Sequence, residues 1–271
     1  MTSAAATLNV LRRNNVKESG VATGRPIVFA HGFGCSQDTW RLVAPHFERD
    51  HRVITFDHVG SGGSDLGAYD RGKYDSLYGY AEDVLEIITQ LDLHDVVYAG
   101  HSVGAMIGVL AAVTSPARFG SLVLVGPSPS YINDGEYVGG FEHEDIDALL
   151  DNLDSNYLGW SSKMAPLIMG NTDRPELAEE LTVSFCSTDP DVARHFARVT
   201  FLSDNRGDLA TVSTPTLIVQ SAKDIMAPAP VGEFVHAQIA GSKLVVVTAN
   251  GHCLNLSHPN ELVAEMRSYL K

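Results

Sequence analysis

Apolar residues gather along this chain in short runs, and turn-forming residues separate one run from the next. Nearly continuous apolar runs of this length are typical of strands buried on both faces, as in a parallel sheet. The pattern predicts six strands, over residues 26–31, 52–57, 95–101, 121–126, 214–220 and 243–249.

Helical periodicity lies between these runs. From Leu77 to Leu91, apolar residues recur at intervals of three and four, which places them in one stripe along a helix. Strands that alternate with helices predict an α/β fold, in which a doubly wound and mostly parallel sheet is covered on both faces.

The strand pattern stops over residues 131–205 and resumes near Pro215, and helical patterns broken by Gly and Pro fill the interval. A stretch of about seventy residues is too long for a loop in a compact domain, so we expect a helical cap. We predict an α/β-hydrolase core at 1–130 and 206–271, with a lid at 131–205 inserted after the sixth strand.

The motif Gly-His-Ser-Val-Gly at 100–104 joins a predicted strand to an apolar helical stretch. This context is typical of a nucleophile elbow, a sharp turn that exposes a serine at the carboxyl edge of a sheet. Gly100 and Gly104 leave room for the turn, and Ser102 is the candidate nucleophile. A helix N-cap role for Ser102 is the alternative, and the partners of this serine decide between the two.

A serine hydroxyl needs a histidine to take its proton and a carboxylate to orient that histidine. In this fold the three residues occur in the order serine, acid, histidine. Asp224 follows the strand predicted at 214–220, and His252 follows the strand predicted at 243–249. Because parallel strands end at one edge of the sheet, we expect both residues to lie beside Ser102.

Other polar residues compete for these roles. His258 precedes a proline at a helix start, which is typical of a capping position. His101 adjoins the serine, and we expect its side chain to point away from that of Ser102. Asp57 and Asp65 flank a glycine-rich stretch, but the lysine of a P-loop is missing, which favours a structural turn.

Acyl transfer also needs N–H donors for the oxyanion that develops on the substrate. The residue after the nucleophile, here Val103, supplies one of them. We expect the second from the turn after the strand at 26–31, where Phe33 lies between Gly32 and Gly34. The predicted oxyanion hole therefore consists of the backbone N–H groups of Phe33 and Val103.

Composition narrows the classes of function. The 271 residues carry a formal net charge of −14, which repels nucleic acid and anionic lipid surfaces. No apolar span is long enough to cross a bilayer, so no membrane partner is expected. The three cysteines fit neither a disulfide framework nor a zinc cluster, and the histidines lack paired ligand spacing on a helix. We expect a cytoplasmic protein without a metal or a cofactor.

Several segments together resemble the RsbQ-like α/β-hydrolase family, which includes a bacterial stress regulator and the plant karrikin and strigolactone receptors. These segments are HGFGCSQDTW, VGSGGSDL, GHSVGAMIGVLA, YINDGEYVGGFE, FLSDNR and NGHCLNLSHP. The resemblance implies a V-shaped lid of four helices over a mostly apolar pocket that contains the serine. By matching positions, it implies that the pocket is lined by Phe33, Tyr131, Phe141, Trp160, Met164, Phe201 and Ile225.

These observations predict a serine hydrolase that acts on a small hydrophobic ester or a butenolide-like lactone through Ser102, His252 and Asp224. The resemblance also implies a signalling role with a small hydrophobic ligand and a partner such as a PAS-domain phosphatase or another regulator. A ligand-sensing regulator with little turnover is the alternative. Cofactor-free haloperoxidases and C–C hydrolases use the same triad and stay open, whereas a dehalogenase would need an aspartate at the elbow.

Overall fold

The computed structural model describes residues 10–271, so residues 1–9 of the predicted core lie outside the described part. Seven strands form one sheet in the order β1-β3-β2-β4-β5-β6-β7. Neighbouring strands run parallel except at the edge, where β1 is antiparallel to β3. The strands are β1 (Lys17–Gly20), β2 (Arg25–Ala30), β3 (His51–Thr55), β4 (Val96–His101), β5 (Phe119–Val125), β6 (Thr216–Lys223) and β7 (Lys243–Asn250).

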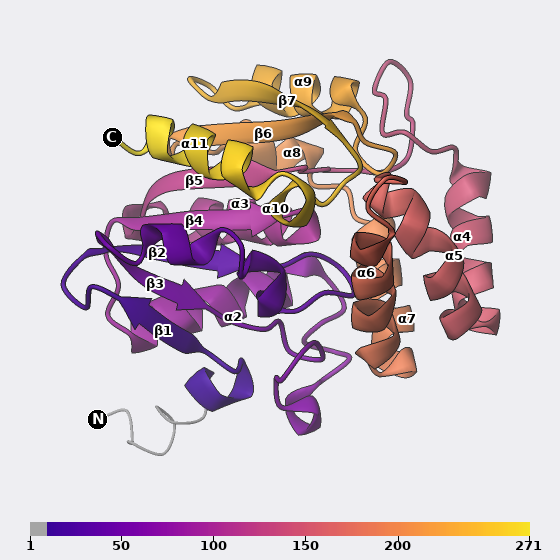
Figure 1. Ribbon diagram of the computed structural model, residues 1–271, viewed down its shortest axis with the longest axis horizontal. Helices are drawn as coiled ribbons and strands as arrows, with labels where there is room; N and C mark the ends of the chain where they lie inside the picture. The colour runs from indigo at the N-terminus through magenta and orange to yellow at the C-terminus, as the bar shows by residue number, and fades with distance from the viewer. Residues whose placement is uncertain (1–9) are drawn as a thin grey trace.

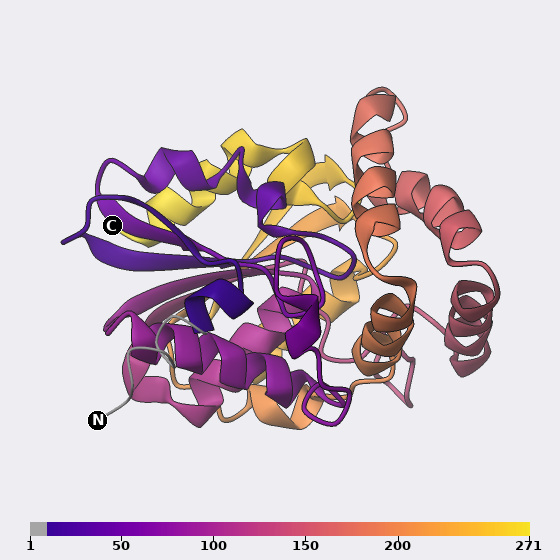
Figure 2. The same cartoon turned by 90° about the horizontal axis from the view of Figure 1, so that it is seen from below.

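Helices cover both faces of this sheet (Figures 1 and 2). One face carries α2 (Leu77–Gln90), α3 (Val103–Thr114), α8 (Arg206–Leu209) and α9 (Ala229–Gln238). The other carries the 3-10 turns η1 (Gln37–Trp40) and η2 (Ala44–Phe47) with α10 (Leu254–Ser257) and α11 (Pro259–Tyr269). Two further 3-10 turns are η3 (Leu66–Ala68) and η4 (Pro116–Arg118). The doubly wound α/β fold is therefore confirmed.

Adjacent residues of the central strands belong to two separate apolar clusters. In β2, Ile27 and Phe29 face the cluster that contains Trp40. Val28 faces the cluster formed with α2 and α3. Because successive side chains of a strand point to opposite faces, a strand covered on both faces must be apolar throughout. This two-sided burial explains the continuous apolar runs of the sequence.

Five helices lie between β5 and β6 in the described chain, and the first four of them lie at the end of the sheet where the parallel strands terminate (Figures 1 and 2). All four fall within residues 131–205, and the division into core and lid stays a prediction. Within residues 10–271, the insertion follows the fifth strand and not the sixth, because β1 alone precedes the four predicted strands β2–β5. We call these four helices the lid helices; they are α4 (His143–Ser155), α5 (Tyr157–Met169), α6 (Pro175–Ser187) and α7 (Pro190–Phe201).

Two of the lid helices have clear start signals. Both α6 and α7 begin with a proline, whose fixed φ and missing N–H suit the first helical position. Asp189 then caps α7, since its carboxylate accepts the N–H groups of Asp191 and Val192.

None of the helices in the described part combines the length and apolar character needed to cross a membrane.

Candidate active site

Ser102 lies at a strained corner between β4 and α3. Its φ of 56° and ψ of −126° fall in a region that residues with side chains avoid, at a cost of about 1–3 kcal/mol. A Cβ on Gly100 would lie 2.4 Å from the carbonyl oxygen of Gly104, and a Cβ on Gly104 would lie 2.4 Å from that of His31. Both positions therefore require glycine. Ser102 makes no side-chain capping bond to α3, so the N-cap alternative does not hold.

A chain of hydrogen bonds joins the three residues predicted for catalysis. The Nε2 atom of His252 lies 2.8 Å from the Oγ atom of Ser102, and its Nδ1 atom lies 2.7 Å from Oδ2 of Asp224. Asp224 directly follows β6, and His252 comes two residues after β7. All three side chains are buried. The structure thus brings together residues that lie up to 150 positions apart in the sequence.

The carboxylate of Asp224 is fixed on both oxygens. Oδ1 accepts the N–H groups of Met226 and Ala227 at 2.8 and 3.1 Å, which leaves Oδ2 for His252. Burial raises the pKa of Asp224, but the charge and hydrogen bond of His252 and these two N–H groups outweigh burial and hold the pKa below its ordinary value. An ionised carboxylate makes Nδ1 of His252 the donor. Nε2 is then free to accept the proton of Ser102.

His101 supports the main chain of His252. Its Nε2 atom lies 3.0 Å from the carbonyl oxygen of His252, so this nitrogen carries the proton and donates. Burial, followed by the charge of His252, lowers the pKa of His101 to about 3. The neutral ring therefore holds the loop of the candidate base in place, although it also borders the cavity described below.

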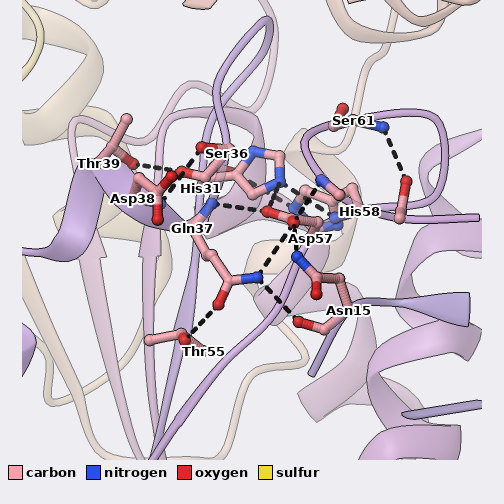
Figure 3. Close-up of polar contacts among 12 residues, drawn as sticks. Asn15, His31, Ser36, Gln37, Asp38, Thr39, Thr55, Asp57, His58 and Ser61 are labelled. Carbon is pink, nitrogen blue, oxygen red and sulfur yellow. Dashed lines mark hydrogen bonds and ion pairs between the residues drawn. The ribbon is translucent and has the colours of Figure 1, made fainter. Parts of the chain in front are cut away.

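The other competing residues have structural roles. His258 occupies the position before α11. Asp65 caps η3 by accepting the N–H of Gly67. Asp57 accepts N–H groups from Asn15 and Gln37 (Figure 3). It also accepts the N–H of Gly63 and so anchors the glycine-rich turn. Over residues 10–271, no cluster of three His, Cys, Asp or Glu side chains is arranged to hold a metal ion.

A small cavity of about 30 Å³ adjoins Ser102 and His252. Four of the predicted pocket residues line it, namely Phe33, Tyr131, Trp160 and Phe201. Sequence reasoning missed the wall residues Cys35, Ile168, Leu181, Phe185, Thr200, Met226 and Cys253. Two of these wall residues could be predicted from the sequence, because Met226 and Cys253 lie within two residues of the predicted acid and base.

The remaining three predicted pocket residues lie outside this cavity. Phe141 and Met164 line a separate groove of about 700 Å³ between α4 and α5. Within the described part, Trp160 is the one residue that lines both spaces, so it lies between them. Ile225 is 49% exposed, whereas its neighbour Met226 is buried. Asp224 accepts the N–H of Met226, and this turn directs the side chain of Met226 inward and that of Ile225 outward.

The two predicted oxyanion donors lie at the edges of the same site. Val103 is the first residue of α3, and the first N–H groups of a helix have no acceptor within that helix. The turn that carries Phe33 packs directly on the nucleophile, since a Cβ on Gly32 would lie 3.1 Å from Cβ of Ser102. Their role as an oxyanion hole stays a prediction.

Known proteins resemble this chain over nearly its whole length. Residues 27–266 match the model of the Alpha/beta hydrolase family. The Karrikin insensitive 2 receptor CA of Petunia hybrida is 39% identical over 92% of this chain and 93% of its own length. The Strigolactone esterase D14 of Arabidopsis thaliana is 37% identical over 97% and 98%. A solved hydrolase structure from Oleispira antarctica is 42% identical with a TM-score of 0.94, and 97% of both chains is covered. The chain therefore belongs to the alpha/beta hydrolase family.

Proposed function

We propose that this protein hydrolyses small hydrophobic esters or lactones, including butenolide-like lactones, with Ser102 as nucleophile, His252 as general base and Asp224 as the group that orients the imidazole. The observation that carries the proposal is the hydrogen-bonded chain from Asp224 through His252 to Ser102, with distances of 2.7 and 2.8 Å. The 2.8 Å distance is short enough for direct proton transfer from the serine to the histidine, and the 2.7 Å bond to Asp224 holds the imidazole in place.

In the first half of the reaction, Oγ of Ser102 attacks the carbonyl carbon while its proton passes to Nε2 of His252. The negative charge that develops on the carbonyl oxygen faces the N–H groups of Phe33 and Val103. The leaving oxygen takes the proton from His252, and an acyl-enzyme remains. Water then attacks the acyl carbon as His252 accepts its proton. His252 passes this proton to the departing Oγ of Ser102, which releases the acid and restores the serine hydroxyl.

The lining of the cavity supports a small apolar substrate. The walls beside Ser102 are mainly aromatic and aliphatic, with Phe33, Trp160 and Phe185 among them. Such walls favour compact hydrophobic groups, and the few polar atoms set orientation. Relatives named as a strigolactone esterase and a probable esterase support the same chemistry.

A ligand-sensing role is the second candidate, and the relative named as a karrikin receptor favours it. In this version the chain is RsbQ-like, turns over little, and reports an enclosed ligand to a partner such as a PAS-domain phosphatase. Three exposed apolar side chains on α5 and α6 support contact with a partner, namely Leu158, Leu167 and Val183. The free thiols of all three cysteines support a cytoplasmic location.

Intact mass spectrometry tests the hydrolase proposal. The wild type and a Ser102→Ala variant would be exposed to short-chain aryl esters, lactones and butenolides. We expect the wild type to gain the mass of an acyl group or to release product, and the variant to do neither. Wild-type protein without serine-dependent turnover or adduct on any of these compounds would overturn the hydrolase proposal.

The signalling candidate needs its own test. The purified protein, with and without a butenolide, would be titrated against a PAS-domain phosphatase while phosphatase activity is followed. We expect activation that depends on the butenolide and is lost in a Leu167→Asp variant on the exposed face of α5. Phosphatase activity that is unaffected by any addition would reject this partner.

A further inference from the structure

We infer that His31 is a positioning residue for the oxyanion hole, because its Nδ1–H group holds the Gly32 carbonyl and thereby aims the N–H of Phe33. His31 follows β2 directly and is fully buried. The inference deepens the proposed function and rests on it, since it requires Phe33 to donate to an oxyanion.

The argument begins with one peptide plane. Nδ1 of His31 lies 2.9 Å from the carbonyl oxygen of Gly32. In a trans peptide the C=O and N–H groups point to opposite sides of the same rigid plane. A bond that fixes the Gly32 carbonyl therefore also fixes the N–H of Phe33 and directs it away from His31. This plane belongs to the turn that packs on Ser102.

The direction of the hydrogen bond follows from the other ring nitrogen. Nε2 of His31 accepts the backbone N–H of His58 at 3.0 Å, so it carries no proton (Figure 3). In a neutral imidazole the proton must then lie on Nδ1, which donates to Gly32. Burial lowers the pKa of His31, in spite of the nearby charge of Asp57, and this keeps the ring neutral.

The loop that supplies this N–H is itself held in place. His58 directly follows Asp57, whose carboxylate accepts two N–H groups from Gln37 at 2.7 and 3.1 Å. Asn15, shown in Figure 3, donates to the same carboxylate at 2.7 Å, and Gly63 donates to it at 2.9 Å. In turn, Nε2 of His58 donates a hydrogen bond to the carbonyl oxygen of His31 at 3.2 Å. These bonds leave His31 little freedom to rotate.

A direct role for His31 in proton transfer does not fit these contacts. Both ring nitrogens are engaged, one by Gly32 and the other by His58. Nε2 of His252 already faces the hydroxyl of Ser102. His31 therefore acts on the reaction through the backbone of the turn, and the contacts require a donor at Nδ1 and an acceptor at Nε2.

Two substitutions separate these two functions of the ring. The side-chain nitrogen of asparagine is as many bonds from Cα as Nδ1, so His31→Asn keeps a donor for Gly32 and loses the acceptor for His58. The amide of glutamine reaches the position of Nε2, so His31→Gln keeps the acceptor and loses the donor. Each variant loses one buried hydrogen bond, which makes them matched controls for stability.

We expect His31→Gln to lower kcat about ten- to hundredfold, which is less than the effect of deleting an oxyanion donor outright. KM should stay within about threefold of wild type, because the ground-state contacts do not change. His31→Asn should retain most of kcat. Phenylboronic acid, which forms a tetrahedral adduct with the serine, should bind His31→Gln more weakly by about the same factor as kcat falls.

Equal losses of kcat in both variants, or boronic acid affinity that is unchanged in His31→Gln, would overturn the inference. The outcome stays separate from that of the proposed function, which fails only if the wild type has no Ser102-dependent turnover. Imidazole ¹⁵N NMR of the wild-type protein measures which ring nitrogen of His31 carries the proton. This test does not depend on whether the variants fold. We expect His31 to carry its proton on Nδ1, and a proton on Nε2 would contradict the inference.

Discussion

The backbone N–H of His252 donates to the carbonyl oxygen of Ile168 at 2.8 Å, which ties the loop of the candidate base to the end of lid helix α5. The fit between the two segments is close, because a Cβ on Gly251 would lie 1.8 Å from the carbonyl oxygen of Met169. The side chain of Ile168 also lines the cavity beside Ser102. The position of α5 and that of the base are therefore coupled.

Gly251→Ala should lower kcat without unfolding the protein. The new methyl group collides with Met169 and displaces the loop, and a shift of about 1 Å in a catalytic group costs up to about 100-fold in rate. Gly241→Ala is the matched control, since Gly241 has a φ of 72° against 85° for Gly251 and has nothing within 4 Å of the added Cβ. Steady-state kinetics of both variants would check this, and equal losses would contradict the coupling.

Asp224→Asn should abolish most of the activity while the fold remains. An amide N–H that faces Nδ1 of His252 selects the tautomer with the proton on Nε2, and this tautomer cannot accept the proton of Ser102. The equivalent change in a serine protease costs about 10⁴-fold in kcat. Asp65→Asn, at the cap of η3, provides a control in which kcat should not change. A loss in Asp224→Asn of less than about tenfold would contradict the assigned role.

Acid should destabilise the protein partly through His101. Its pKa is about 3 in the folded state against an ordinary value of 6.5, so the unfolded chain binds the proton more readily. Stability from this group is therefore complete above pH 6.5 and is lost progressively as the pH falls toward 3. Between pH 6.5 and 5 the loss is roughly 2 kcal/mol in the free energy of unfolding.

His101→Gln tests this effect, since the glutamine amide can still donate to the carbonyl oxygen of His252 but does not titrate. Denaturant unfolding of both proteins across this pH range would give the two slopes. We expect a shallower pH dependence for the variant, and parallel curves would rule out His101 as the source.

Thr200→Val should stabilise the protein. Thr200 is buried, and its hydroxyl has no hydrogen-bond partner among residues 10–271. Removal of an unsatisfied buried hydroxyl is worth about 1 kcal/mol. In contrast, Thr182 of α6 donates to the carbonyl oxygen of Ala178 at 2.8 Å, so Thr182→Val should destabilise. Opposite signs of the change in unfolding free energy are expected, and equal signs would count against this account.

The sequence predicts best those elements whose residue types are restricted at every position, either by burial on both faces of the sheet or by steric limits on the backbone. The central strands β2, β4, β5 and β6 are buried on both faces over most of their length, and this burial leaves a continuous apolar run. The elbow needs glycine at fixed positions, because Gly100 meets Gly104 within the turn and Gly104 meets the carbonyl oxygen of His31 at the end of β2. Strand β1 has neither signal, because its four residues are exposed and it pairs with β3 at the sheet edge through backbone bonds.

The candidate site divides in the same way. The convergence of Ser102, Asp224 and His252 follows from topology, since parallel strands deliver their following loops to one edge. The cavity wall depends on how the lid helices dock, which no local pattern encodes. Leu181 and Phe185 reach the cavity from α6, whereas Phe141 and Met164 line the outer groove.

The placement of Trp160 has a consequence for how the interior communicates with the outside. A space of about 30 Å³ holds little more than one water molecule, whereas ligand sites measure about 300–1,000 Å³. Any guest must push the walls apart, and one of those walls is also the floor of the groove between α4 and α5. The surface of this groove therefore differs between the ligand-bound and the ligand-free protein. A partner that binds the groove can detect the ligand without contacting it.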